Sequence, residues 1–261
     1  MINIRDFDAF CFDLDGTIYV GNQLLPGVKE TIGLLRQHQK SILFITNAPT
    51  QTREGCQKLL TSLGVAAQLE EVLTASFLSA AYFLENCADA RIFIVGERAL
   101  LQEFSNYSLH VTANPLEATH VLVGLDRDFS YQKLNRAMRA VRNGAKLIVT
   151  NPDPSCPVSE GYIADTFAIA KAIEVAAGHP IDLVIGKPSS YYARKVSKQL
   201  NIANERCLII GDRLETDILM GKANQFRTCL VLTGASSKAD INKIKIKPDY
   251  VIENLTELFT K

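Results

Sequence analysis

Two acids separated by a single residue follow an apolar run near the start of the chain. The run at 9–12 is typical of a buried strand, and Asp13, Leu14, Asp15 and Gly16 come directly after it. Two carboxylates at one sheet edge repel each other, so this concentration of charge has no evident structural use. Mg²⁺ would relieve the repulsion, because it prefers one or two carboxylates together with waters and phosphate oxygens. The pair therefore predicts a site for a phosphate group and a metal together.

Three further polar segments lie in the same kind of setting. Thr46 and Asn47 close one apolar run, Lys187 follows a second, and Asp212 follows a third, with Asp217 five residues later. In open parallel α/β sheets, ligands bind in the crevice outside the carboxyl ends of the strands. We therefore expect these side chains to contribute to one site.

In this order, DxDGT, Thr-Asn, a Gly-Lys-Pro lysine and GDxxxxD resemble the motifs of the haloacid dehalogenase-like superfamily. The resemblance is closest to its phosphatase branch with a large cap inserted between the second and third motifs (subfamily IIA, NagD and p-nitrophenyl-phosphatase-like), and it runs from about Phe7 to Leu258. It implies an α/β fold, with a Rossmann-like parallel-sheet core and an inserted α/β cap domain. Within the insert, 150–153 with Pro157 and Gly161 also resembles that branch's cap.

Asp13 is the expected nucleophile, because a carboxylate can attack phosphorus and form an aspartyl phosphate. Asp15 is the expected general acid–base, which protonates the leaving alcohol and then activates water. By the family pattern, Asp13 and the backbone carbonyl of Asp15 are also metal ligands. The dehalogenases of the superfamily lack the second Asp, so Asp15 favours phosphate chemistry. The alternative for both is an acid that caps a strand-end turn.

The other motif residues complete the expected site. Asp212 should bind Mg²⁺ directly, and Asp217 should hydrogen-bond a metal-bound water or orient Lys187. A surface-helix acid is the alternative for Asp217, and Glu215 could take its place. Thr46 and Asn47 should donate to the phosphate, although both are also ordinary turn residues. Lys187 should offset the charge of the nucleophile and the phosphoryl group.

In the insert, Asn151 and Asp153 match the branch's cap motif, which by resemblance faces the active site and contacts substrate. The alternative is a plain loop, because Asn-Pro-Asp-Pro is turn chemistry. The branch has a small residue after the acid that corresponds to Asp165, whereas Thr166 and Phe167 stand here.

Apolar runs alternate with helical patterns throughout, which favours βαβ units and parallel strands. We predict a discontinuous core at 1–78 and 187–261 and an inserted cap at 79–186. The predicted core strands are 9–12, 41–46, 207–210, 228–232 and 250–252, with a hairpin at 18–25 and helices at 26–39, 52–63, 189–200, 215–222 and 255–259. The predicted cap strands are 91–95, 120–125 and 145–149, with helices at 97–105, 130–143 and 166–177.

The composition excludes several classes of protein. The 261 residues carry 28 basic and 28 acidic side chains, which gives no basic face for nucleic acid or a membrane surface. The six cysteines form no CxxC pair and the four histidines no HxH or HExxH pattern, so zinc is not expected. The start has no signal-peptide pattern, and a reducing cytoplasm is the expected compartment.

The sequence thus predicts a Mg²⁺-dependent phosphatase of small phosphomonoesters, such as a sugar phosphate or a nucleotide, without identifying which one. Alternatives from other classes are a phosphotransferase or mutase, and a binding protein that keeps the fold without turnover. The intact set Asp13, Asp15, Thr46, Lys187 and Asp212 argues against the binding protein. The expected partner is the small-molecule substrate, with a homodimer left open and neither nucleic acid nor membrane expected.

Overall fold

The computed structural model describes residues 2–158 and 161–259. Two compact units divide the chain. The first comprises 1–46, 57–73 and 187–261, and the second comprises 47–56 and 74–186. The segments 47–56 and 74–78, which the predicted boundaries place in the core, group with the second unit.

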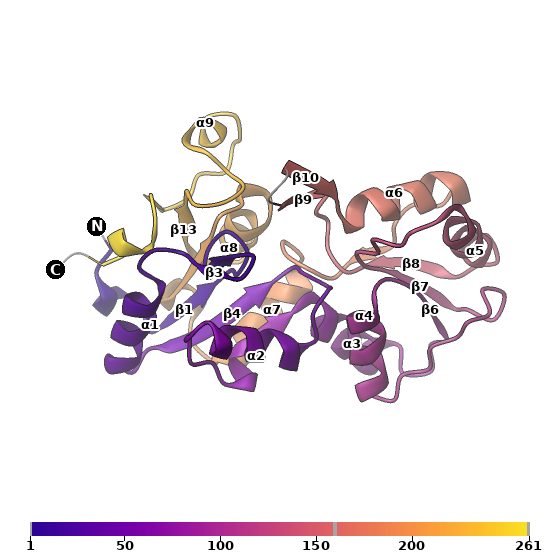
Figure 1. The fold of residues 1–261 in the computed structure, drawn as a ribbon, viewed down its shortest axis with the longest axis horizontal. Coiled ribbons are helices and arrows are strands. Elements are labelled where there is room, and N and C mark those ends of the chain that lie inside the picture. The colour runs from indigo at the N-terminus through magenta and orange to yellow at the C-terminus, as the bar shows by residue number, and fades with distance from the viewer. Residues whose placement is uncertain (1, 159–160, 260–261) are drawn as a thin grey trace. The chain divides into compact units, whose positions relative to one another are not determined.

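The first unit contains a six-stranded sheet in the order β14-β13-β12-β1-β4-β5 (Figure 1). Its strands are β1 (Ala9–Phe12), β4 (Ser41–Thr46), β5 (Val72–Thr74), β12 (Cys207–Gly211), β13 (Arg227–Val231) and β14 (Tyr250–Ile252). Pairing from β4 through β14 is parallel throughout. Strands β1 and β12 are buried along their whole length, as their continuous apolar sequences predict.

The register of this sheet determines which polar residues meet. Phe12 pairs with Phe44 on one side and with Ile210 on the other. Asp13 therefore leaves β1 level with the carboxyl ends of β4 and β12. The carboxyl ends of β1, β4 and β12 therefore lie at one edge of the sheet, as the sequence predicts.

The remaining elements of the first unit agree with most of the predicted ones. The helices are α1 (Val28–Gln37), α2 (Arg53–Ser62, whose first turn belongs to the second unit), α7 (Ser190–Leu200), α8 (Leu219–Ala223) and α9 (Lys238–Ile241). The predicted hairpin is present as β2 (Tyr19–Val20) and β3 (Gln23–Leu24). The predicted helix at 255–259 is only a 3₁₀ turn at Leu255–Glu257, and α8 is preceded by a π-helical turn at Leu214–Ile218.

The second unit contains a four-stranded parallel sheet in the order β11-β8-β7-β6. Its elements are α3 (Ala75–Asn86), β6 (Ile92–Val95), α4 (Arg98–Asn106), β7 (His120–Val123), α5 (Tyr131–Arg142), β8 (Lys146–Val149), β9 (Ser155–Val158), β10 (Gly161–Ala164), α6 (Thr166–Ala177) and β11 (Leu183–Val184). Residues of α5 and α6 pack on one face of the sheet in a single apolar cluster. The antiparallel pair β9–β10 was not predicted. The α/β fold class, with a parallel core sheet and a separate α/β unit, is confirmed.

None of the helices in the described parts of the chain is long and apolar enough to cross a membrane.

Candidate active site

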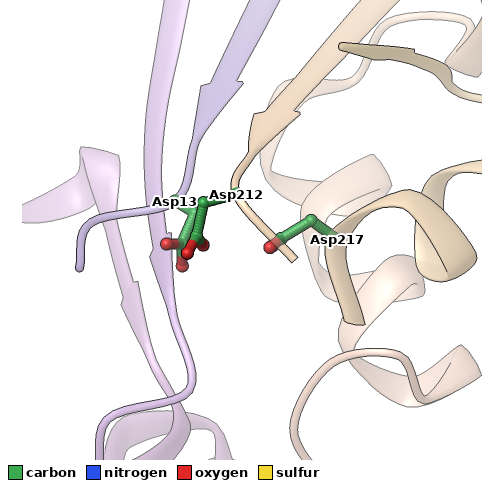
Figure 2. Close-up of side chains that lie close together, drawn as sticks. All are labelled: Asp13, Asp212 and Asp217. Carbon is green, nitrogen blue, oxygen red and sulfur yellow. The ribbon is translucent and has the colours of Figure 1, made fainter. Parts of the chain in front are cut away.

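Three buried carboxylates meet at the carboxyl edge of the first sheet. Asp13 follows β1, Asp212 follows β12, and Asp217 lies in the π-helical turn, with one carboxylate oxygen of each within 4.8 Å of the others. Figure 2 shows the Asp13 and Asp212 side chains next to each other, with Asp217 pointing toward them from its helical segment. π-Helical turns are rare and are frequent at functional sites. This group could hold a metal ion, since hard cations prefer carboxylate oxygens.

Lys187 supplies the positive charge beside this group. Its ammonium lies 2.5 Å from Asp13 Oδ1 and 2.6 Å from Asp217 Oδ1, and it also donates to the Ile45 carbonyl at 3.3 Å. The side chain of Lys187 is only 1% exposed. A buried ammonium is tolerated only when it is paired and hydrogen-bonded, as this one is.

Burial and mutual repulsion set the proton affinities of the group. Burial raises the pKa of Asp13 well above its usual range; the Lys187 ammonium opposes this shift, and the neighbouring Asp217 and Asp212 carboxylates add to it. Burial and Asp217 raise the pKa of Asp212 to about 6. Burial alone would lower the pKa of Lys187, but Asp13 and Asp217 outweigh it and raise that pKa. Three carboxylates and one ammonium leave an excess of negative charge, which a divalent cation would balance.

The Asp212 carboxylate is held closely by backbone. Its Oδ2 accepts a hydrogen bond from the Ala235 N–H at 2.5 Å. A Cβ atom added to Gly16 or Gly234 would lie 2.6 or 2.0 Å from the same oxygen. Gly16 also has φ of +82°, which favours glycine. The two glycines therefore leave room for the Asp212 carboxylate, and the Ala235 N–H holds it. The oxygen-only donor set fits a hard divalent cation such as Mg²⁺.

We expect Gly234→Ala to weaken the affinity for Mg²⁺ roughly 10- to 100-fold, the usual cost of disturbing the support of a metal ligand. The added methyl group would displace the Asp212 carboxylate. The measurement is the Mg²⁺ concentration that gives half-maximal phosphatase activity. Gly33→Ala is the matched control, because a Cβ at that exposed helical position meets nothing within 4 Å. An unchanged Mg²⁺ requirement in Gly234→Ala would contradict the assignment of Asp212.

The structure places the other predicted residues of the first unit as follows. Thr46 ends β4 and is buried, and its carbonyl accepts from the Tyr192 hydroxyl at 3.3 Å. Asp15 is exposed on the turn after β1, with Tyr19 as its bridge partner, and its carboxylate is not in the three-acid group. Glu215 is exposed, whereas Asp217 is 1% exposed and contacts Lys187.

The predicted residues of the second unit are joined to one another by hydrogen bonds. Asn47 Nδ2 donates to Asp153 Oδ2 at 3.0 Å, and Asn151 Nδ2 donates to the Asn47 carbonyl at 3.0 Å. All three residues are buried. Whether Asn47, Asn151 or Asp153 contacts a substrate stays a prediction.

Sequence reasoning missed two supports of the site. One is the loop at 233–236, in which Ala235 holds Asp212 and the Thr233 hydroxyl donates to the Gly16 carbonyl at 2.5 Å. Its position after a predicted strand, with a glycine, is the same signal that marks the other motifs. The second is Tyr192, whose buried hydroxyl also donates to the Leu73 carbonyl at 2.6 Å. A tyrosine inside a helix gives no local signal of that role.

Comparisons with known proteins agree with the motifs. A family profile described as haloacid dehalogenase-like hydrolase matches residues 10–110, and a second, described as HAD-hydrolase-like, matches residues 184–258. Sugar-phosphatase AraL of Bacillus subtilis is 32% identical to this chain, and the match covers 94% of this chain and 90% of the AraL sequence. Glycerol-3-phosphate phosphatase of Rattus norvegicus is 33% identical over 98% of this chain and 91% of its own.

Solved structures show the same likeness over the whole fold. A 4-nitrophenylphosphatase from Thermotoga maritima superposes with a TM-score of 0.91 at 32% identity, covering 98% of this chain and 97% of its own. NagD from E. coli K-12 superposes with a TM-score of 0.86 at 27% identity, covering 97% of this chain and 98% of its own. The chain therefore belongs to the haloacid dehalogenase-like hydrolases, in the branch of NagD and the p-nitrophenyl phosphatases (subfamily IIA).

Proposed function

We propose that this protein is a Mg²⁺-dependent phosphatase that hydrolyses small phosphomonoesters through an aspartyl phosphate on Asp13. The observation that carries the proposal is the buried group in which Lys187 bonds to both Asp13 and Asp217 beside Asp212. Such a group has no evident use in stabilising the fold, because buried charges of one sign cost free energy.

Each residue has a role in the proposed reaction. An Asp13 oxygen attacks phosphorus, the bond from phosphorus to the alcohol oxygen breaks, and Asp15 gives its proton to that oxygen. Water then attacks the phosphorus of the phospho-aspartate and loses a proton to Asp15, which releases phosphate and restores Asp13. The exposed position of Asp15, two residues after Asp13, suits a group that exchanges protons.

The charged neighbours make the first attack possible. Lys187 lies 2.5 Å from Asp13 Oδ1, so it favours the ionised form of the nucleophile and offsets the charge of the phosphoryl group. Asp217 fixes the Lys187 ammonium from the other side. Mg²⁺, held by Asp13, the Asp15 carbonyl and Asp212, would neutralise phosphate oxygens when bound. Thr46 and Asn47 would donate hydrogen bonds to the phosphate.

The relatives favour a small polar substrate. Three of the proteins compared above are named as a sugar phosphatase, a glycerol-3-phosphate phosphatase and a 4-nitrophenylphosphatase. A sugar phosphate, glycerol 3-phosphate or a related metabolite is therefore the proposed substrate class, with residues 79–186 acting as the cap that selects among them. We place the protein in the cytoplasm, where its cysteines, all free among the described residues, would stay reduced.

Removal of divalent cations is expected to abolish activity. Exhaustive treatment with EDTA should reduce hydrolysis of 4-nitrophenyl phosphate, glycerol 3-phosphate and a panel of sugar phosphates to the background rate, and Mg²⁺ should restore it. The reason is the excess negative charge of the three-acid group, which repels a phosphate dianion unless a cation is present. Undiminished hydrolysis after EDTA would refute the metal assignment, and an inactive Mg²⁺-loaded protein across the panel would refute the proposed function.

A further inference from the structure

A buried polar cluster in the second unit consists of Asn47, Asn151 and Asp153, hereafter the Asn47 cluster. Their exposed fractions are 8%, 0% and 8%. Besides the two bonds that join Asn47 to Asp153 and Asn151, the Asn151 Oδ1 accepts from the Asp153 N–H at 3.0 Å. Three hydrogen bonds therefore tie the three residues into one closed group.

Asn47 and Gly186 of the second unit stand at two of the four positions where the chain passes from one unit to the other. Asn47 directly follows Thr46, and Gly186 directly precedes Lys187, and both peptide bonds join residues of different units. The Gly186 N–H donates to the Thr150 carbonyl at 2.8 Å. A Cβ added to Gly186 would lie 2.6 Å from Asn47 Oδ1, so Asn47 and Gly186 are adjacent within the second unit.

The hydrogen bonds of Asn151 leave little for a substrate. Its amide has two N–H groups. One donates to the Asn47 carbonyl and the other to the Thr166 hydroxyl at 3.1 Å, and its oxygen accepts from Asp153. The side chain is fully buried. Asn151 therefore has its polar groups satisfied inside the second unit, which is the behaviour of a structural linker.

We propose that Asp153 and Asn151 are positioning residues, which act through Asn47 to hold the adjacent Thr46 in place. This inference rests on the proposed function of the site. Asp153 accepts a hydrogen bond from the side chain of Asn47, and Asn151 donates one to its backbone carbonyl. Both the side chain and the backbone of Asn47 are therefore held. Loss of either bond would loosen Asn47 and, through the peptide bond, Thr46. The chemical step depends on Thr46 whatever alcohol is attached to the phosphate.

The role differs from substrate contact in what it predicts. A residue that contacts the alcohol part of a substrate changes the preference among substrates, with little effect on an aryl phosphate. A positioning residue lowers kcat for every substrate by a similar factor. Its own charge is not needed, because any acceptor in the place of the Asp153 carboxylate oxygen can receive the Asn47 amide.

The test compares Asp153→Ala with Asp153→Asn, using 4-nitrophenyl phosphate, glycerol 3-phosphate and a sugar phosphate. We expect Asp153→Ala to lower kcat roughly 10²-fold for all three, the cost of misplacing reacting groups by about 1 Å, with KM changed less. Asp153→Asn, whose amide oxygen can still accept from Asn47, should recover most of that loss. Asp89→Ala, at an exposed position of the same unit, is the control and should match the wild type. Asp153→Leu, of similar volume, replaces the Ala variant if that variant does not fold.

A double-mutant cycle with Asn47→Ala decides whether Asp153 acts through Asn47. We expect Asp153→Ala to add little to the loss caused by Asn47→Ala, because the contact is already gone. Three outcomes would overturn the inference while leaving the phosphatase assignment intact. These are fully additive losses of kcat in the double mutant, a loss of kcat confined to one substrate, and equal losses of kcat in Asp153→Ala and Asp153→Asn. A wild-type protein without phosphatase activity would refute both.

Discussion

Asp13→Asn is expected to lower kcat for every phosphomonoester by at least about 10⁴-fold, as removal of a nucleophile does in other covalent mechanisms. The amide is nearly isosteric with the carboxylate and can still accept from Lys187, which lies 2.5 Å from Asp13 Oδ1. The nucleophilic oxygen and its negative charge are lost. Because Lys187 keeps its ion pair with Asp217 at 2.6 Å, the variant should still fold.

The matched control for this variant lies at the other end of the same strand. Asp8 precedes β1 and pairs with Arg206 at 2.9 Å on the surface. Asp8→Asn removes a carboxylate of the same chemistry and should leave kcat unchanged, with a change in stability of about 1 kcal/mol or less. Substantial turnover in Asp13→Asn, after deamidation is excluded by mass spectrometry, would show that Asp13 is not the nucleophile.

Lys187→Met should have the second largest effect, on both stability and activity. The substitution leaves Asp13 and Asp217 buried without their cation, and such a loss costs about 3–5 kcal/mol of unfolding free energy. Activity should fall by roughly 10³-fold, because the charge that stabilises the phosphoryl transition state is gone. The measurements are urea unfolding of the metal-free protein and kcat at saturating Mg²⁺.

Lys222→Met is the control, since Lys222 forms only a partly exposed ion pair with Asp249 at 2.9 Å. It should cost about 1 kcal/mol or less and leave kcat unchanged. If Lys187→Met were as stable and as active as Lys222→Met, the ion pairs of Lys187 would neither stabilise the fold nor contribute to phosphoryl transfer.

The meeting of Asp13 and Asp212 could be predicted from the sequence because it follows from local patterns. Asp13 and Asp212 each come directly after a continuous apolar run, and parallel pairing of Phe12 with Ile210 aligns the two run ends. The hairpin around Gly21 is present for a similar reason, since a turn residue between apolar residues is a short-range signal.

The rest depends on contacts between residues far apart in the chain. Asn47 bonds to Asn151 and Asp153, more than a hundred residues away, and no periodicity in either segment indicates this. Residues 47–56 likewise group with the second unit rather than with the predicted core. Strand β10 was missed because its strand signal is weak, as Gly161 and an alanine occupy two of its four positions.

The measurement that tests the phosphatase mechanism most directly is the site of covalent phosphorylation. Asp15→Asn should remove the base that activates water, so that a phospho-enzyme formed from 4-nitrophenyl phosphate accumulates. Acid quenching, reduction with borotritide and peptide mass spectrometry would then locate the modified side chain. We predict that the label is on Asp13, formed in amounts close to one per chain and absent from Asp13→Asn. Label on a serine, threonine or histidine, or steady hydrolysis with no label on Asp13, would contradict the mechanism.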